Sequence, residues 1–186
     1  MALAAVALIA AGCGFGGGTK TVTVSRTQTV TTTQTVTSKF PTATEACTGA
    51  DLAGTFALVP GSAGAGQIEY ALTVTNTSHT RCFVRGVPKA TLLAASGAAL
   101  PTHVTAAGDG GKGAIMLEPG ASAVAHARFS PDVAGQGDSQ SGACQPEAQT
   151  LQVNPDGGGA TDAAIKPPTS VCERGTLNFE AFGYAG

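Results

Sequence analysis

Apolar and polar residues alternate with a period of two along several short segments of this chain. In the clearest segment, residues 68–75, apolar side chains occupy every second position from Ile68 to Val74. This alternation predicts a half-buried antiparallel strand, and weaker versions of it predict eight further strands. These are residues 52–59, 81–85, 90–95, 100–105, 114–117, 122–129, 149–153 and 176–182. Glycine, proline or aspartate clusters separate most of them and no stretch has a helical period, so the pattern predicts an antiparallel β-sandwich.

The composition supports short strands and predicts a mainly aliphatic core. The 26 glycines and 10 prolines disfavour long helices. The chain has no tryptophan, 7 phenylalanines and 2 tyrosines, so the core is expected to consist of valine, leucine, isoleucine and alanine. Such a core stabilises a fold less per residue than an aromatic-rich one. We therefore expect covalent links to help hold the fold together.

The cysteines beyond the N-terminal region are the expected links. Cys47, Cys82, Cys144 and Cys172 are even in number, as in the disulfide framework of a protein bound for an oxidising compartment. Four cysteines permit three pairings, and we favour Cys47–Cys82 and Cys144–Cys172 because each joins neighbours in the sequence. Each bridge is expected to contribute about 2–4 kcal/mol. Zinc is the alternative, but the chain has no Cys-x-x-Cys or His-x-x-x-His spacing.

The N-terminal residues predict an address outside the cytoplasm. Residues 2–11 form an uncharged apolar run, too short to span the roughly 30 Å hydrocarbon core of a membrane but as long as a signal-peptide core. Residues 8–13 (Leu-Ile-Ala-Ala-Gly-Cys) resemble the lipobox of bacterial lipoproteins. In that family a diacylglycerol is attached to the cysteine, here Cys13, and the chain is cut just before it. An ordinary signal peptide with an incidental cysteine is the alternative.

These features divide the chain into three segments. Residues 1–12 are predicted to be a lipoprotein signal peptide, and residues 13–46 to be the lipidated Cys13 with a flexible threonine-rich tether. Residues 47–186 are predicted to form the β-sandwich domain. The expected location is the extracytoplasmic face of the cell membrane, reached through the lipid, or outside the cell if Cys13 carries no lipid.

The charge distribution excludes a nucleic-acid partner. Residues 19–39 carry three basic side chains and no acidic one, which leaves seven basic and 12 acidic side chains in the rest of the chain. Nucleic-acid binding depends on clustered lysine and arginine, and the part of the chain outside residues 19–39, with a net charge of −5, lacks that feature. The expected partners are the membrane, through the N-terminal lipid, and a protein or another envelope component.

Three histidines and one methionine suggest a metal-binding alternative. Imidazole and thioether ligands select copper, so the candidate ligands are His79, His103, His126 and Met116. His126 alternates with alanines in residues 122–129, which places it on the outer surface or at an edge if the alanine face is core. Met116 lies in an apolar run and is more simply a core residue. We therefore expect no metal and no cofactor, and keep envelope metal handling as the alternative function.

Four further motifs fail to match the chemistry that they resemble. Gly137-Asp138-Ser139 is similar to the surroundings of a serine-protease nucleophile, but it is followed by Gln-Ser instead of Gly-Gly. Residues 108–113 lack the serine or threonine that follows the lysine of a phosphate-binding loop. Residues 156–159, with Asp162, lack the alternating acids of a calcium loop. Asn76-Thr77-Ser78 matches a glycosylation acceptor but is expected to be a turn. We expect no enzymatic activity.

Several landmarks occur in the order of a known family. They are Cys47, Val74-Thr75-Asn76-Thr77-Ser78, Cys82, Gly86-Val87-Pro88, Leu117-Glu118-Pro119-Gly120, Cys144 and Val153-Asn154-Pro155. Over roughly residues 47–185 the chain resembles the domain of unknown function numbered 4232, which is common in secreted and lipid-anchored proteins of actinobacteria. The resemblance implies an immunoglobulin-like sandwich and supplies no catalytic residue. We therefore expect a secreted, lipid-anchored cell-envelope protein whose domain is a non-enzymatic binding or structural module.

Overall fold

A computed structural model describes residues 44–111 and 113–185 of the chain. The predicted signal peptide (1–12), Cys13 and nearly all of the predicted tether lie outside the described residues. The described residues belong to one compact unit. None of the helical segments in this part of the chain has the length and apolar character needed to cross a membrane.

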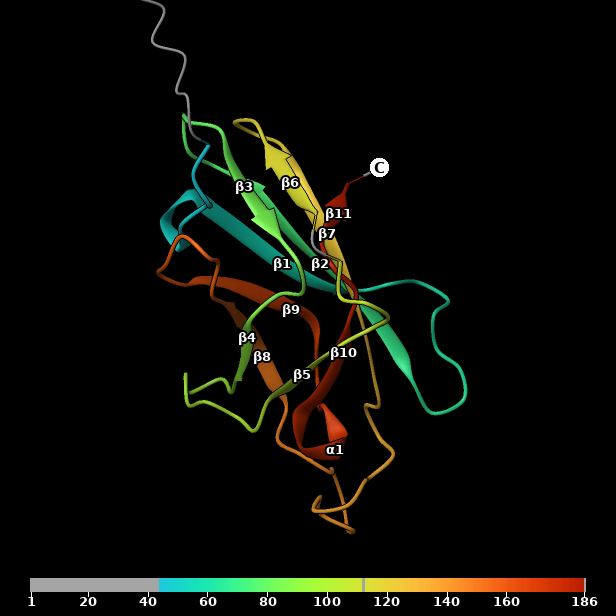
Figure 1. Cartoon of the computed structure of the whole chain (residues 1–186). Coiled ribbons are helices and arrows are strands. Elements are labelled where there is room, and N and C mark those ends of the chain that lie inside the picture. Colours follow the sequence, from blue (N-terminus) through green and yellow to red (C-terminus); the bar gives the residue numbers. More distant parts are fainter. Residues whose placement is uncertain (1–43, 112, 186) are drawn as a thin grey trace, which may run out of the picture. The chain divides into compact units, whose positions relative to one another are not determined.

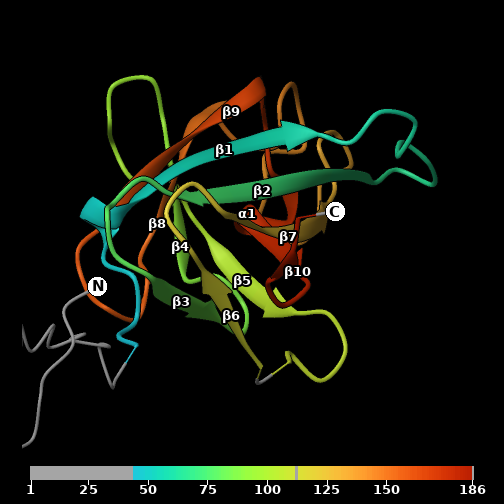
Figure 2. The same cartoon turned by 90° about the horizontal axis from the view of Figure 1, so that it is seen from above.

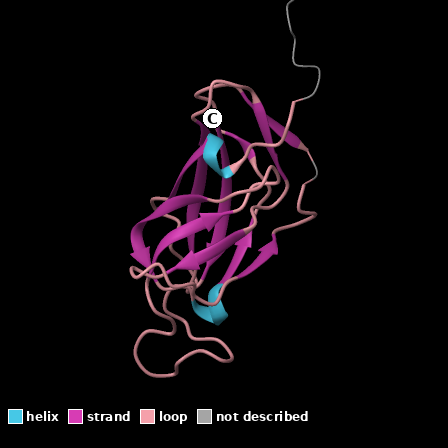
Figure 3. Cartoon of the chain, turned by 90° about the vertical axis from the view of Figure 1, so that its left-hand side faces the viewer, coloured by secondary structure: helices cyan, strands magenta, loops and turns pink. Residues whose placement is uncertain are grey.

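The described residues are almost entirely strands and connecting loops (Figure 1). The strands are β1 (Leu52–Leu58), β2 (Ile68–Asn76), β3 (Cys82–Arg85), β4 (Ala90–Leu93), β5 (His103–Ala106), β6 (Ala114–Leu117), β7 (Ser122–Phe129), β8 (Ala148–Val153), β9 (Thr161–Thr169), β10 (Thr176–Phe179) and β11 (Gly183–Tyr184). Two short helical turns, η1 (Gly49–Asp51) and α1 (Cys172–Gly175), lie at opposite ends of the strands (Figure 3). The prediction of an all-β domain is confirmed.

The strands form a large sheet and a small one around a common core. The large sheet has the order β4-β8-β9-β1-β2-β7-β10-β5, with β11 paired to β7, and the small sheet pairs β3 with β6. Seen from above, β9, β1 and β2 form one layer, and β3, β6 and β5 lie on the opposite side (Figure 2). The large sheet curls until its end strands meet, since the Leu92 backbone N–H on β4 donates to the Thr102 hydroxyl just before β5 at 2.8 Å. The result is an immunoglobulin-like β-sandwich.

Two strand pairs depart from the fully antiparallel arrangement that we expected. β1 runs parallel to β9, and β5 runs parallel to β10. Both pairs join strands that are far apart in the sequence, so no hairpin forces them to run in opposite directions. The alternation of apolar and polar residues predicts where strands lie, but it does not predict whether two distant strands pair in parallel or antiparallel.

The alternating segments place their apolar sides in the core as predicted. On β2 the buried positions run from Tyr70 to Asn76 at every second residue, and on β7 the alanines and Phe129 are buried. The expectation of an aliphatic core is wrong at its centre. There Phe56 packs against Tyr70 and Phe179 with ring centroids 5.1 and 5.9 Å apart, and Tyr70 packs against Phe129 at 5.3 Å. The few aromatic residues are concentrated where they bury most area.

Strand β9 was not predicted, although it occupies the middle of the large sheet between β8 and β1. It does alternate, because Thr161, Ala163 and Ile165 are buried and their neighbours are exposed. Alanines weaken that signal, and two prolines at 167–168 argue against a central strand. These prolines follow the residues paired with β1, beside an irregularity in the β8 register, where their missing N–H groups break no ladder bond.

Both disulfides have the favoured pairing. Cys47, which lies just before η1, is bonded to Cys82 at the start of β3. Cys144 is bonded to Cys172 at the start of α1. The two bonds therefore lie at opposite ends of the sandwich, each beside a short helical turn (Figure 3).

Candidate binding pocket

A cavity of about 480 Å³ opens between the segment after β3 and the turn after β8. Its apolar floor consists of Leu52, Val84 and Val153, which are almost fully buried. Val87 and Phe182 add to the apolar lining. The volume lies within the range of small-molecule sites in proteins, which combine apolar walls with a few placed polar groups.

The walls of this pocket are held by backbone hydrogen bonds to residues 86–89. The Phe182 N–H donates to the Gly86 carbonyl at 2.9 Å, and the Asn154 N–H donates to the Lys89 carbonyl at 2.8 Å. Gly86 has φ +64°, a conformation that favours glycine and turns the chain out of β3. Pro88 and Pro155 also line the cavity and stiffen their segments. The pocket is therefore formed where three separate segments of the chain, residues 86–89, Asn154 and Phe182, are joined by backbone hydrogen bonds.

Three charged side chains lie together at the edge of the pocket. Asp156 accepts from Arg85 Nε and from Lys89 Nζ, each at 2.8 Å. Hydrogen bonds from Lys89 and then from Arg85 lower the pKa of Asp156, so its carboxylate stays ionised at neutral pH. Two cations share one anion here, giving the edge a local charge of +1 in a domain (residues 47–186) whose net charge is −4.

The Cys47–Cys82 bond braces the wall that carries Asp156. The Gly157 N–H donates to the Cys47 carbonyl at 3.2 Å, and the Gly49 N–H donates to the Gly158 carbonyl at 2.9 Å. A Cβ at Gly157 would lie 2.5 Å from the Cys47 carbonyl oxygen, so only glycine allows this approach. Cys82 begins β3, which leads directly into the opposite wall. The disulfide thus joins the supports of both walls.

The four candidate copper ligands are spread over different elements. His79 is exposed in the β2–β3 loop, His103 is exposed at the start of β5, and His126 lies in the middle of β7. Met116 on β6 is half-buried and pairs with Phe83. Its expected place in the core is wrong, because Leu117 takes the fully buried position and Met116 alternates with it.

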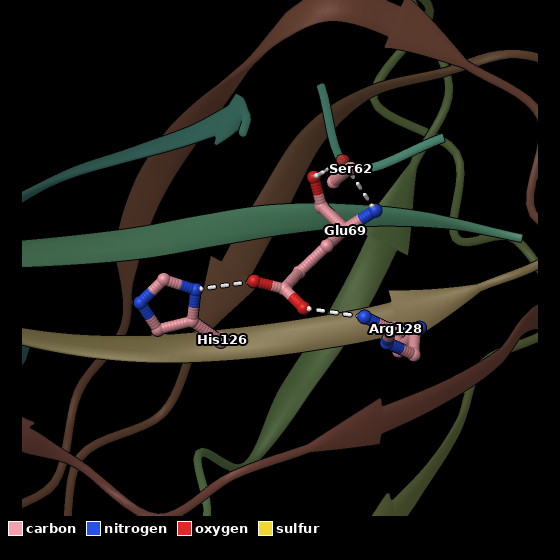
Figure 4. Close-up of polar contacts among 4 residues, drawn as sticks. All are labelled: Ser62, Glu69, His126 and Arg128. Carbon is pink, nitrogen blue, oxygen red and sulfur yellow. Dashed lines mark hydrogen bonds and ion pairs between the residues drawn. The ribbon is translucent and has the colours of Figure 1, made fainter. Parts of the chain in front are cut away.

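His126 lies on the outer face of the large sheet, opposite the buried alanines, as predicted. Its Nδ1 lies 2.9 Å from Glu69 Oε1, and Glu69 Oε2 accepts from Arg128 at 3.3 Å (Figure 4). Ser62 lies nearby but bonds only to the Glu69 backbone within the described residues, so Ser62 and His126 do not form a nucleophile–base pair. A small cavity of about 80 Å³ adjoins these side chains.

The serine-protease-like segment has a structural role that the sequence did not indicate. Asp138 is 9% exposed, and its carboxylate accepts from Gln145 and from the backbone N–H groups of Gly135, Glu173 and Arg174. Burial acts to raise its pKa, but these four hydrogen bonds prevail and lower it to about 2. Glu173 and Arg174 have φ of 54° and 55°, so the carboxylate binds successive N–H groups of a left-handed turn.

Asp138 therefore holds the β7–β8 loop against α1 next to the Cys144–Cys172 bond. These three residues form the one group of three or more close metal-type ligands in the described part of the chain. Because both sulfurs are in the disulfide, they cannot also ligate a metal. Ser139 is exposed and donates to the Ser141 carbonyl at 2.7 Å, as expected of a loop.

The remaining motifs are mostly structural, as predicted. Asn76 is fully buried, and its Nδ2 donates to the carbonyls of Thr80 and Leu117 at 2.8 and 3.0 Å, which makes it the turn residue. Residues 156–159 form a turn. Asp162 instead lies on strand β9, where it accepts from Gln152 at 3.3 Å.

Sequence reasoning did not find the pocket. Two of the landmark segments, residues 86–88 and 153–155, line it side by side. The sequence does show that both segments come at the ends of strands, contain a proline and adjoin charged residues, which are common features of binding loops. Nothing in a single sequence placed them together, because they are 65 residues or more apart.

These features define a class: a disulfide-linked, immunoglobulin-like β-sandwich with an apolar pocket between its loops. A family model described as "Domain of unknown function (DUF4232)" matches residues 47–183, and the chain belongs to this family. No curated protein and no solved structure matches the chain.

Proposed function

We propose that this chain is a lipid-anchored protein of the cell envelope whose sandwich domain binds a small ligand in the pocket between residues 85–89 and 153–156. The observation that carries the proposal is the cavity of about 480 Å³ with an apolar floor and a charged edge. A concave cavity with an apolar lining and a few charged groups at its edge is the usual form of a ligand site. The domain acts by binding and performs no chemical reaction on its ligand.

The proposed location is supported by the N-terminal sequence and by the cysteines. Residues 2–13 have the apolar run and terminal cysteine of a lipoprotein signal, and Cys13 is the proposed site of lipid attachment. Disulfides persist in oxidising compartments, so two of them in the domain agree with an extracytoplasmic location. The threonine-rich tether then separates the binding domain from the membrane.

Small-molecule extraction tests the binding function. The protein is purified from its native envelope, denatured, and the released small molecules are identified by mass spectrometry. A Val87→Trp variant places a large side chain at the pocket lining and is expected to lose the co-purifying molecule. The matched control is Val133→Trp, a 54% exposed position outside the pocket lining, which should keep it. Equal recovery from both variants would contradict a site in this pocket.

A further inference from the structure

At the charged edge of the pocket, Arg85 and Lys89 have hydrogen-bond donors that no protein group in the described residues accepts, while the one carboxylate, Asp156, already accepts from both. Within the described residues, Arg85 uses its Nε on Asp156, and Lys89 uses its Nζ on the same carboxylate. Arginine carries five N–H donors and the lysine ammonium three, so most of them have no protein acceptor in this part of the chain. Asp156, the anion between them, is already engaged by both cations.

We propose that the ligand of this pocket is an amphiphilic anion, an apolar body carrying a carboxylate or phosphate group. This inference rests on the proposed function and specifies the chemistry of its ligand. The apolar body lies on the floor formed by Leu52, Val84 and Val153. The anionic group binds Arg85 and Lys89, which suit carboxylate and phosphate oxygens equally.

Asp156 acts in this arrangement as an internal competitor of the ligand anion. It occupies donors of both cations in the free protein, and it repels an anion at the pocket edge. Removing its charge raises the local charge from +1 to +2. Two unit charges about 4 Å apart interact by about 1 kcal/mol in water-like surroundings, and by more where the dielectric constant is lower. The Asp156→Asn variant is therefore expected to bind an anionic ligand roughly fivefold more tightly.

The attraction for an anion is confined to the pocket edge, because two basic residues are gathered there. Two of the seven basic residues outside the tether lie at this edge, whereas the domain as a whole is acidic and repels anions. The Arg85 guanidinium also lies 5.7 Å from the ring centroid of Phe83, and this cation–π contact helps to orient the Arg85 side chain. A cationic or neutral amphiphile would find the same apolar floor but would leave these donors unused.

The test is calorimetric titration of the full chain carrying Cys13→Ser, with four probes that each have a straight chain of ten carbons. They are decanoate, decyl phosphate, decanol and decyltrimethylammonium. Both anions are expected to bind at least tenfold more tightly than the neutral and cationic probes. Asp156→Asn should tighten anion binding roughly fivefold, and Arg85→Gln should weaken it about tenfold. The relative affinity of decanoate and decyl phosphate shows which anion the edge prefers.

The matched control for Asp156→Asn is Glu118→Gln. Glu118 also accepts from an arginine, Arg81 at 3.2 Å, but lies outside the pocket lining. This substitution makes the same change in net charge and should leave anion affinity within about twofold. An equal gain in both variants would mean that overall charge governs binding, and would overturn the proposal.

The outcomes separate the two proposals. If decanol or decyltrimethylammonium binds as tightly as the anions, and Val87→Trp abolishes that binding, the pocket functions but the anion inference is wrong. If Asp156→Asn fails to tighten anion binding, the inference is wrong as well. If no probe binds the chain, both the anion inference and the pocket function are contradicted.

Discussion

Removing the two disulfides one at a time should cost nearly the same stability but should affect the pocket very differently. The variants are Cys47→Ala with Cys82→Ala, and Cys144→Ala with Cys172→Ala. In the chain-entropy description, a disulfide stabilises the fold by restricting the unfolded chain, and the effect grows slowly with loop length. The sequence separations are 35 and 28 residues. These give about 3.8 and about 3.6 kcal/mol at 25 °C, a difference too small to measure.

The burial of the four cysteines does not upset this near equality. Each disulfide has one fully buried cysteine, Cys47 or Cys172, and one partner that is 5% exposed. Truncation to alanine therefore leaves similar gaps at both ends of the sandwich. We expect each double variant to lower the free energy of unfolding by about 3–4 kcal/mol, measured by guanidinium denaturation followed by far-ultraviolet circular dichroism at 25 °C.

The two variants should differ in ligand binding. The Cys47–Cys82 bond joins the supports of both pocket walls through the Cys47 carbonyl, which accepts from Gly157, and through β3. Its removal is expected to weaken decanoate binding by about tenfold, whereas removal of Cys144–Cys172 should leave it within about twofold. A loss below about 1 kcal/mol in either variant would refute the entropy argument. Equal binding by both variants would refute the bracing of the pocket.

Three more predictions concern other residues. The folded-state pKa of Asp138, about 2, lies below its ordinary value of 3.8, so its contribution to stability is complete above about pH 5 and is lost as the pH falls toward 2. Asp138→Asn should flatten this part of the pH–stability profile, and an unchanged profile would contradict the role given to the carboxylate. Asn76→Ala removes the side-chain donor to the buried Leu117 carbonyl and one of two donors to the Thr80 carbonyl, and should cost about 1–3 kcal/mol in denaturant unfolding, whereas a cost near zero would show that the turn does not need the side chain. Cys13→Ser should release the protein from membranes or leave it unprocessed, as shown by cell fractionation and intact mass, and unchanged membrane association of a processed chain would count against lipidation.

The strands that the sequence predicted well are those with large apolar side chains at alternate positions. β2 and β7 were found within one residue at each end, since their buried residues contrast clearly with polar neighbours. β9 alternates as regularly, but Ala163 gives little contrast with its exposed neighbours. Periodicity reports how strongly the two faces of a strand differ, so a strand built from alanine and ended by proline escapes it.

The features that carry function were harder to predict because they depend on contacts between distant segments. The pocket brings Arg85 and Lys89 to Asp156, 67 or more residues later in the chain. Asp138 likewise binds the turn at Glu173 and Arg174. Local patterns identify a loop and its charges, but a single sequence contains no direct record of which loops meet. The disulfide pairing was predictable because each bond joins two cysteines that are consecutive in the sequence, so sequence order alone pointed to it.

Native mass spectrometry of the protein taken from its own cells in mild detergent tests the central claim most directly. The account predicts a chain that begins at Cys13 with a diacylglycerol attached, has both disulfides formed, and carries a small anionic molecule that Val87→Trp removes. A chain that retains Met1, with free thiols and no bound molecule, would contradict both the proposed location and the proposed binding function.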